Sequence, residues 1–476
     1  MNNINIPILK TNNAEISNAF NIAYSDLISS ITTFKDGLLS EEKPVIMAGL
    51  GYVTPWTRDS AINTWNGAGL LLSGIAKDTL MSVLTTDNGK IRIGGQYWDA
   101  IIWAIGAWWE YLFTGDKEFL AVSLDAVKNS LKYFEETEFD SELNLFRGPA
   151  CYGDGVSAYP DTYACGSSGI LSFTEDFPDL AYPKGEGIPM HALSTNCLYY
   201  YAYKLADIMA AESGFEPIPG YAEKAEKMKE AINKHFYLPE KSTFRYIVDN
   251  FGNCDYQEGM GLSFAILFGL ADKKQTEDIF NNIYTSPQGI PCVWPTFPRY
   301  RTSDNAGFGR HSGTVWPHVE AFFADAACKN GREDLFEKEL GVMAARAVRD
   351  GHFAEIYHPL SGQIYGGRQE QYNIGIFEWK SELKQTWSAT GYIRMVLMDL
   401  IGMNFAPDGI TFSPCMVCGI TDLSMKNIPY RDMYLNIHIS GDGKNISRFC
   451  INGSQSDKAF VSADLHGNVN IDITMC

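Results

Sequence analysis

The chain has 476 residues, of which 45% are hydrophobic and 20% charged, values that argue against wholesale disorder and allow one large core or several ordinary domains. Acidic residues outnumber basic ones by 57 to 38, which gives a net charge of −19. Because no lysine- or arginine-rich block offsets this charge, we expect neither a nucleic-acid partner nor an anionic membrane.

The N-terminal segment and the cysteines indicate a compartment. The sequence MNNINIPILK lacks the basic and apolar regions of a signal peptide, and the longest apolar runs, such as IIWAIGAWW, are too short to cross a bilayer. We therefore expect a cytoplasmic protein, with a trimmed export signal as the alternative. The cysteines lie mostly in apolar helical stretches, which favours reduced, buried thiols. Cys415 and Cys418 form a lone C-x-x-C without nearby histidines, so we expect no metal.

Helical periodicity dominates the first 400 residues. The pairs of expected helices are joined by loops that alternate between short and long, and the long loops carry Gly, Pro and aromatic residues. This rhythm predicts a mainly α fold, a closed ring of helical hairpins in two concentric layers with the functional loops on one rim. The expected helices cover residues 14–35, 58–75, 97–113, 117–136, 189–213, 220–236, 258–270, 273–284, 312–329, 332–349 and 380–401.

The pattern changes near Phe405 to short alternating runs, separated by turn sequences such as Gly441-Asp442-Gly443. The runs are ITFSP, YLNIHIS, RFCING, AFVSAD and NVNIDITM. We expect a helical domain over residues 1–404 and a small antiparallel, β-sandwich-like domain over residues 405–476. All ten tryptophans lie between Trp56 and Trp387, within the helical part.

Two segments place charged and aromatic residues together at expected helix starts. Gly49–Trp65 contains Trp56, Arg58 and Asp59. Asp59 can cap the helix by accepting hydrogen bonds from free backbone amides, or it can form a clamp with Arg58 for two adjacent hydroxyls, with Trp56 as a stacking wall. In the second segment, GGQYWDA, the capping alternative is equally open for Asp99.

Two further segments carry carboxylates in long loops. Asp154 lies between two glycines in LFRGPACYGDGVSAYPD, where it is either a turn residue or a general acid directed into a cavity. Glu355 lies among apolar residues in FAEIYHPLSGQIYGG. Because burying a carboxylate is costly unless it has partners, a functional role is favoured for Glu355.

The segments RHSGTVWPHVEAFF and ELKQTWSATGYIRM bring Trp316 and Trp387 to helix starts. His318 and Glu320 are two residues apart and diverge on a helix, which disfavours a metal site. The chain contains no P-loop, no dinucleotide-binding glycine fingerprint, no G-x-S-x-G and no H-E-x-x-H, and we expect no cofactor.

Several of these segments resemble six-hairpin, (α/α)6-toroid glycosidases, and the resemblance covers the whole helical part. WTRDSA is similar to a motif of glucoamylases and related enzymes, and AEIYHPLSG resembles the E-x-Y-x-P-x-T-G segment of glycoside hydrolase family 63. GTVWPH and QTWSATGYIRM look like late segments of family 63 and of glycogen-debranching glucosidases. The C-terminal region is similar to the β-sandwich appended to several toroid families.

The resemblance implies roles for individual residues. Glu355 matches the general base, and Arg58 and Asp59 match the pair that holds the terminal sugar. The general acid of family 63 is an Asp in a Gly-rich loop, for which Asp154 is the matching position. GPACYGDGVSAYP fits that pattern only loosely, so Glu258 and Asp99 stay as alternatives, and Ser361 stands where Thr is usual. The further expected substrate contacts are Trp56, Trp98, Asp99, Glu258, His311, Trp316, Tyr357 and Trp387.

These residues predict an inverting, exo-acting α-glycoside hydrolase, of the α-glucosidase kind, that cleaves oligosaccharides by general acid and general base catalysis without a cofactor. One alternative is a glycoside phosphorylase, in which phosphate replaces the base. Another is a catalytically inactive carbohydrate-binding relative. A polysaccharide lyase is disfavoured because an acidic cleft repels a uronate. No expectation about the oligomeric state follows.

Overall fold

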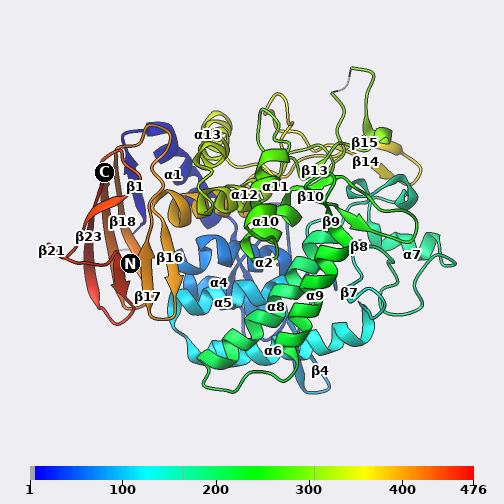
Figure 1. Cartoon of the computed structure of the whole chain (residues 1–476), viewed down its shortest axis with the longest axis horizontal. Helices are drawn as coiled ribbons and strands as arrows, with labels where there is room; N and C mark the ends of the chain where they lie inside the picture. Colours follow the sequence, from blue (N-terminus) through cyan, green and yellow to red (C-terminus); the bar gives the residue numbers. More distant parts are fainter. Residues whose placement is uncertain (1–5, 165, 305) are drawn as a thin grey trace.

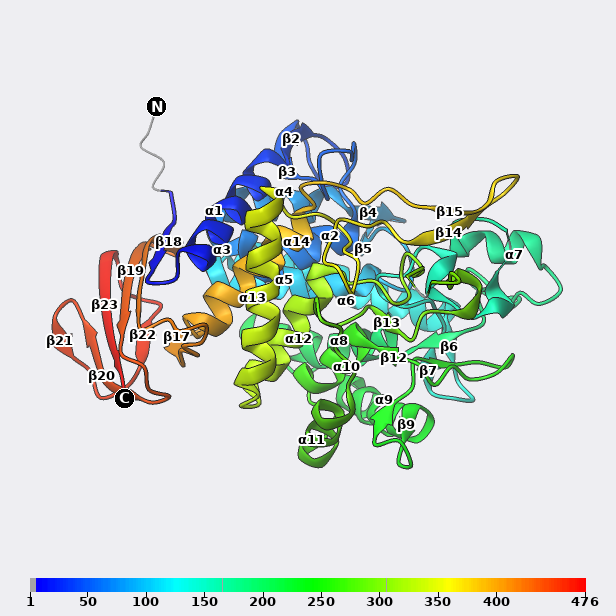
Figure 2. The same ribbon diagram turned by 90° about the horizontal axis from the view of Figure 1, so that it is seen from above.

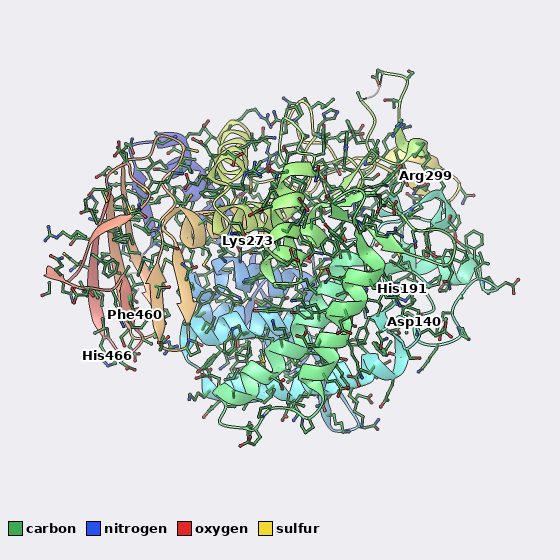
Figure 3. The ribbon with its side chains drawn as sticks, in the orientation of Figure 1. Asp140, His191, Lys273, Arg299, Phe460 and His466 are labelled. Carbon is green, nitrogen blue, oxygen red and sulfur yellow. The ribbon has the colours of Figure 1, made fainter. Side chains whose placement is uncertain are left out.

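The computed structural model describes residues 6–164, 166–304 and 306–476. A helical body carries the C-terminal sheet at one end (Figures 1 and 2). The hairpin of β14 (Arg368–Gln371) and β15 (Gly375–Glu378) and the short helix α7 (Phe173–Asp176) lie at the other end. Figure 3 shows the same separation, with Phe460 and His466 on the sheet end and Arg299 among the distant loops.

Within the described residues, six helical segments contact one another in turn and close a ring. Nearly all of their residues are buried, which explains why these segments are rich in Ala, Gly and aromatic residues and poor in exposed charge. In chain order they are α2 (Thr57–Asn63) with the π-helical turn Thr64–Ala68 and α3 (Gly69–Leu71), α5 (Trp103–Thr114), α8 (Leu193–Glu212), α10 (Gly259–Leu267), α12 (Pro317–Lys329) and α14 (Thr386–Arg394), which a π-helical turn over Met395–Leu400 continues.

A second set of helices covers the ring and buries mainly one face of each helix. These are α1 (Ala14–Ser29), α4 (Ser73–Ser82), α6 (Lys117–Thr137), α9 (Tyr221–Phe236), α11 (Lys273–Asn282) and α13 (Glu333–Asp350). Asp116 caps α6 by accepting a hydrogen bond of 2.9 Å from the Phe119 amide. Asp272 and Gln275 form a capping box on α11.

Several expected helices differ from the structure: those over residues 97–113, 312–329 and 380–401 begin five or six residues later, and two others differ for clear local reasons. The helix predicted over residues 58–75 is interrupted at Gly67, whose φ of 116° is outside the helical range, and the chain resumes as α4 up to Ser82. The helix predicted over residues 14–35 ends at Ser29. The following ITTF sequence is β-branched and forms β2 (Ile31–Phe34), which pairs with β3 (Lys43–Ile46).

Short strand pairs brace the loops between helices. They are β4 (Leu84–Asp87) with β5 (Lys90–Ile93), β6 (Phe139–Asp140) with β7 (Leu145–Phe146), β8 (His191–Ala192) with β11 (Ile247–Val248), β9 (Tyr237–Leu238) with β10 (Thr243–Phe244), and β12 (Gln257–Glu258) with β13 (Val293–Trp294).

The runs expected to be strands after Phe405 coincide with β17 (Gly409–Phe412), β19 (Met433–Ser440), β20 (Ile446–Ile451), β22 (Phe460–Ser462) and β23 (Gly467–Met475). With β16 (Met403–Ala406), β18 (Asp422–Tyr430) and β21 (Ser454–Gln455) they form two sheets, β1-β18-β19-β23-β20-β21 and β16-β17-β22. Side chains of both sheets share one hydrophobic cluster.

Two features of this region correct the sequence-based expectation. β19 and β23 pair in parallel, so the domain is not purely antiparallel; β23 reaches this place through the crossover that contains β20 to β22. In addition, β1 (Ile8–Thr11) pairs antiparallel with β18 and buries Leu9. The strand at the start of the chain is therefore part of the C-terminal sheet and not of the helical domain expected over residues 1–404. The boundary near residue 405 otherwise stays a prediction. No helix among the described residues is long and apolar enough to cross a membrane.

Candidate active site

A small polar cavity opens where inner helices α2, α12 and α14 begin. Seven residues predicted from the sequence line it: Trp56, Arg58, Asp59, Asp154, Trp316, Glu355 and Trp387. Tyr52, Tyr152 and Arg310 complete the lining and were not predicted. The cavity thus lies where five loops meet. Three of them lead into inner helices, and the other two are the long loops that carry Asp154 and Glu355.

Arg58 connects the floor of the cavity to the segment before α5. Its Nη1 donates to Asp99 Oδ2 at 2.6 Å and to the Cys151 carbonyl at 3.2 Å, while its Nη2 lies 4.0 Å from Asp154 Oδ2. The guanidinium lies 5.4 Å from the ring centre of Trp387. The Asp99 carboxylate therefore serves as the buried partner of Arg58, outside the cavity lining, and the capping alternative for Asp99 does not hold.

Asp59 is almost completely buried and lies in the first turn of α2. Trp56 occupies the capping position, and Asp59 Oδ1 has no hydrogen-bond partner in the part of the chain that the structure describes. Burial raises the pKa of Asp59 to about 7, the carboxylates of Glu355 and Asp154 add to this effect, and Arg58 opposes it. Asp59 thus lines the cavity and does not cap the helix.

Asp154 reaches the cavity from a tightly packed loop between Gly153 and Gly155. A Cβ atom at Gly153 would lie 2.2 Å from the hydroxyl of Tyr159, so only glycine permits this approach. The Asp154 side chain is 30% exposed, and three nitrogen atoms surround it. Besides Arg58 Nη2, they are Arg310 Nη1 at 3.8 Å and His311 Nε2 at 3.6 Å from Oδ1.

Glu355 is buried on the other side of Arg310. Its Oε1 lies 3.6 Å from Arg310 Nη2, and its Oε2 accepts a hydrogen bond of 3.4 Å from the Glu382 amide. Burial raises the pKa of Glu355; Arg310 and the Glu382 amide oppose this rise, while the charges of Asp154 and Glu382 add to it. The partners that a buried carboxylate requires are therefore present.

Arg310 is the most important residue of the site that the sequence did not predict. Its two terminal nitrogens face Asp154 and Glu355, and its guanidinium packs on the ring of Trp379 at 4.4 Å. A lone arginine in a loop before a helix has no distinctive spacing, so nothing in the pattern pointed to it. Tyr152 did carry a signal, because it precedes the Gly-Asp-Gly sequence directly.

Trp316 and Trp387 form aromatic walls of the cavity. Their rings meet at 65° with centres 5.8 Å apart, and Trp316 Nε1 donates to the Arg310 carbonyl at 2.8 Å. Trp56 is 37% exposed. Rigid aromatic walls beside carboxylates and arginines suit a polyhydroxylated ligand, which has both apolar faces and hydrogen-bonding edges.

Five residues predicted as substrate contacts lie outside the cavity lining: Asp99, Glu258, Trp98, Tyr357 and His311. Trp98 is completely buried in the core, edge-on to Tyr97. Tyr357 accepts a hydrogen bond of 2.8 Å from the Ala354 amide and packs under Arg346. His311 is buried behind Asp154. The sequence places these residues close to the loops of the site but does not say toward which side each side chain points.

Glu258, the rival candidate for the general acid, also lies outside the cavity lining and is completely buried. Its Oε2 accepts a hydrogen bond of 3.1 Å from the Ser194 amide at the start of α8. Burial raises the pKa of Glu258 to about 8, so this carboxyl group is mostly neutral at pH 7. It ties α10 to α8 rather than facing a ligand.

The chain is similar in sequence to known glycoside hydrolases. The profile of the mannosylglycerate hydrolase MGH1-like glycoside hydrolase domain matches residues 55–388, well over half of the chain. A mitochondrial neutral/alkaline invertase of Oryza sativa subsp. japonica is 25% identical over 178 residues, which are 34% of this chain and 26% of the invertase.

Solved structures share the fold. A sialidase superposes with a TM-score of 0.66 at 16% identity over 96% of this chain and 41% of its own. A GH63 mannosylglycerate hydrolase of Thermus thermophilus in complex with glucose has a TM-score of 0.56 at 14% identity, over 79% of this chain and all of its own. The chain thus spans less than half of the invertase and of the sialidase.

The buried carboxyl group of Glu258 leads to a prediction about stability. Because its folded pKa is about 8, well above the unfolded value, its contribution is fully present below the unfolded pKa and is lost as the pH rises toward 8. Between these values the free energy of unfolding should fall by up to about 1.4 kcal/mol per pH unit on account of this group. In Glu258→Gln this part of the slope should disappear, as measured by urea unfolding at several pH values.

The exposed Glu240→Gln variant is the control, and its slope should match that of the parent protein. Equal slopes in the parent and in Glu258→Gln would show that Glu258 is ionised in the folded state.

Proposed function

Because the chain belongs to the mannosylglycerate hydrolase MGH1-like glycoside hydrolase family, we propose that it is an inverting, exo-acting α-glycoside hydrolase of the α-glucosidase kind. The observation that carries this proposal is the single cavity in which Asp154 and Glu355 lie at opposite ends of one guanidinium. Asp154 donates a proton to the leaving oxygen, and Glu355 deprotonates the attacking water. Hydrolysis by this route requires no cofactor.

The placement of Arg310 supports the two-carboxylate mechanism. The facing oxygens of Asp154 and Glu355 can be no further apart than the 3.8 Å and 3.6 Å contacts and the width of the guanidinium between them. This upper limit admits the roughly 6.5–9.5 Å of inverting glycosidases and equally the roughly 5–5.5 Å of retaining ones, so the choice of inversion rests on the match of Glu355 to the general base of glycoside hydrolase family 63. A glycoside phosphorylase would use phosphate in place of Glu355, and the presence of a buried carboxylate there favours hydrolysis.

The small cavity supports exo action on one terminal sugar. The residues around it enclose little free space, which favours a single terminal sugar ring over a longer stretch of the substrate. Asp59 lines the cavity and has one carboxyl oxygen without a partner among the described residues, whereas Arg58 Nη1 is already bonded to Asp99. The Arg58–Asp59 clamp therefore binds mainly through Asp59 and through Nη2 of Arg58.

The wider expectations are proposed on the same basis. The closed ring of helices, covered by a second layer and carrying two sheets, supports an (α/α)6 toroid with a β-sandwich-like domain. The GH63 mannosylglycerate hydrolase with a related fold was solved with glucose, which supports a gluco-configured sugar here. An oligosaccharide or glycoside is thus the proposed substrate, and a cytoplasmic location stays a prediction.

Replacing either carboxylate should abolish most of the activity. We expect Glu355→Gln and Asp154→Asn each to lower kcat/KM by about 10²–10⁴-fold with the fold intact, because each loses a proton-transfer step. Glucose release from 4-nitrophenyl α-D-glucopyranoside measures the effect, and circular dichroism checks the fold. Glu258→Gln is the control and should keep its activity, because this buried carboxyl lies outside the cavity lining. Wild-type turnover by Glu355→Gln, or turnover that depends on phosphate, would contradict the proposal.

The acid limb of the kcat/KM pH profile should reflect the ionisation of Glu355. A general base works only when ionised, so activity is lost as the pH falls through its pKa, which burial raises. The neighbouring charge of Glu382 adds to that rise. In Glu382→Gln the acid limb of the kcat/KM profile should therefore move to lower pH, as measured by initial rates between pH 4 and 9. An acid limb that stays in place or moves upward would argue against Glu355 as the base.

A further inference from the structure

His311 is a buried histidine directly behind Asp154. Its Nε2 lies 3.6 Å from Asp154 Oδ1, beyond hydrogen-bonding distance, and has no hydrogen-bond partner within the described residues. The imidazole stacks on Trp316 with ring centres 4.8 Å apart and also faces Tyr152. A buried nitrogen without a partner is costly, and Asp154 is the group in position to supply one.

The other ring nitrogen determines which hydrogen-bonding role Nε2 has. Ser157 Oγ lies 3.1 Å from His311 Nδ1 and donates to Gln369 Oε1 at 3.2 Å. A hydroxyl carries one proton, and the amide oxygen of Gln369 can only accept. With the Gln369 amide oriented so that its oxygen accepts the Ser157 proton, Nδ1 of His311 is assigned as the donor to Ser157 Oγ. Nε2 is then a bare acceptor.

The charge state of His311 agrees with this assignment. Burial lowers the pKa of His311 well below its usual value, and the positive charges of Arg310 and Arg58 add to the effect. The imidazole is therefore neutral. A neutral imidazole with a bare Nε2 can accept a proton in a hydrogen bond but does not remove it from a carboxylic acid.

Asp154 needs such a neighbour if it is to act as a general acid. Arg58 and Arg310 both approach its carboxyl group, and an acid catalyst must hold its proton until the leaving group arrives. Within the described residues, the ionisable groups that interact electrostatically or pack with Asp154 or His311 are Tyr52, Arg58, Asp59, Asp99, Tyr152, Tyr159, Arg310, His318 and Glu355. Among these, none offers Asp154 the neutral acceptor that His311 offers, so far as the described residues extend.

We propose that His311 is a positioning residue for the general acid, whose Nε2 accepts a hydrogen bond from protonated Asp154 and keeps that proton on the carboxyl group until the leaving group arrives. The inference rests on the proposed function for Asp154. The proton then passes from Asp154 to the glycosidic oxygen as the C–O bond breaks, while Glu355 takes a proton from water. The resulting Asp154 carboxylate faces the lone pair of Nε2, which favours its reprotonation from solvent.

The separation of 3.6 Å between His311 Nε2 and Asp154 Oδ1 fits this role. Catalytic hydrogen bonds are often long in the absence of substrate and shorten when it binds. The packing needed for the contact is already present, because a Cβ atom at Gly155 would lie 2.4 Å from Gln369 Oε1 and 2.7 Å from His311 Cε1. Glycine at position 155 thus lets the Asp154 loop, Gln369 on β14 and His311 meet.

The test is His311→Phe, which keeps an aromatic ring against Trp316 and removes Nε2. Two substrates with the same sugar are compared, methyl α-D-glucopyranoside, whose leaving group needs protonation, and α-D-glucosyl fluoride, whose leaving group does not. We expect kcat for the methyl glucoside to fall by about tenfold or more. This loss is smaller than the roughly 10²–10⁴-fold acceleration that general acid catalysis contributes as a whole, because Asp154 itself stays in place. The rate on the fluoride should change less than twofold, and the alkaline limb for the methyl glucoside should move to lower pH.

His318→Phe is the matched control. His318 is also completely buried, stacks on Trp387 at 4.0 Å, and both of its ring nitrogens are unpaired among the described residues. It does not approach Asp154, so its replacement should affect both substrates equally. Equal losses on the two substrates in His311→Phe as well would overturn the inference.

Two further variants separate the possible outcomes. Ser157→Ala leaves His311 in place but removes the hydroxyl that holds the ring proton on Nδ1. The proton can then lie on Nε2, which donates to the Asp154 carboxylate. The alkaline limb of the pH profile should again move to lower pH. An unchanged limb in Ser157→Ala would contradict the assigned tautomer. Asp154→Asn separates the inference from the function: undiminished hydrolysis of the methyl glucoside in that variant would remove the proposed function itself.

Discussion

Arg58 and Arg310 hold four carboxyl groups together at the centre of the helical ring, and the whole cavity depends on this balance of charge. Asp99 and Asp154 approach Arg58, while Asp154 and Glu355 approach Arg310; the fourth carboxyl group, Asp59, adjoins Arg58 in the chain. Four ionised carboxylates beside two arginines would leave net negative charge in a buried place, which is costly. Burial raises the pKa of Asp99 to about 7, so a large fraction of this carboxyl group is protonated near neutral pH. The net negative charge of the buried cluster is smaller as a result.

The fold explains why these groups can meet. Three inner helices, α2, α12 and α14, begin at the cavity and contribute residues at or near their first turns, such as Arg58 on α2 and Trp387 on α14. The ring itself is packed with buried apolar side chains and gives the site a rigid support. The side chains of the site are thus held in place by inner helices. These helices are apolar because they are buried on all sides.

The sequence predicts the site best where spacing constrains it. Arg58 and Asp59 are adjacent at a helix start, and Glu355 is a carboxylate among apolar residues, so each stands out by physical criteria alone. Arg310 does not, because a single loop arginine acquires its meaning only from two carboxylates that are far away in the chain. His311 was recognised as a site residue, but as a sugar contact, since the sequence cannot tell that its ring lies behind Asp154. The parallel pairing of β19 with β23 and the addition of β1 to the same sheet were missed for the same reason, because both join distant segments.

The central claim is that Asp154 and Glu355 act from opposite sides of one anomeric carbon. Proton NMR of the first glucose released from 4-nitrophenyl α-D-glucopyranoside tests it most directly, because the configuration of that product is set before mutarotation. The account predicts that the β-anomer appears first, as expected when water attacks opposite to the leaving group. Initial release of the α-anomer would mean that the configuration is retained and would contradict the assignment of the two carboxylates.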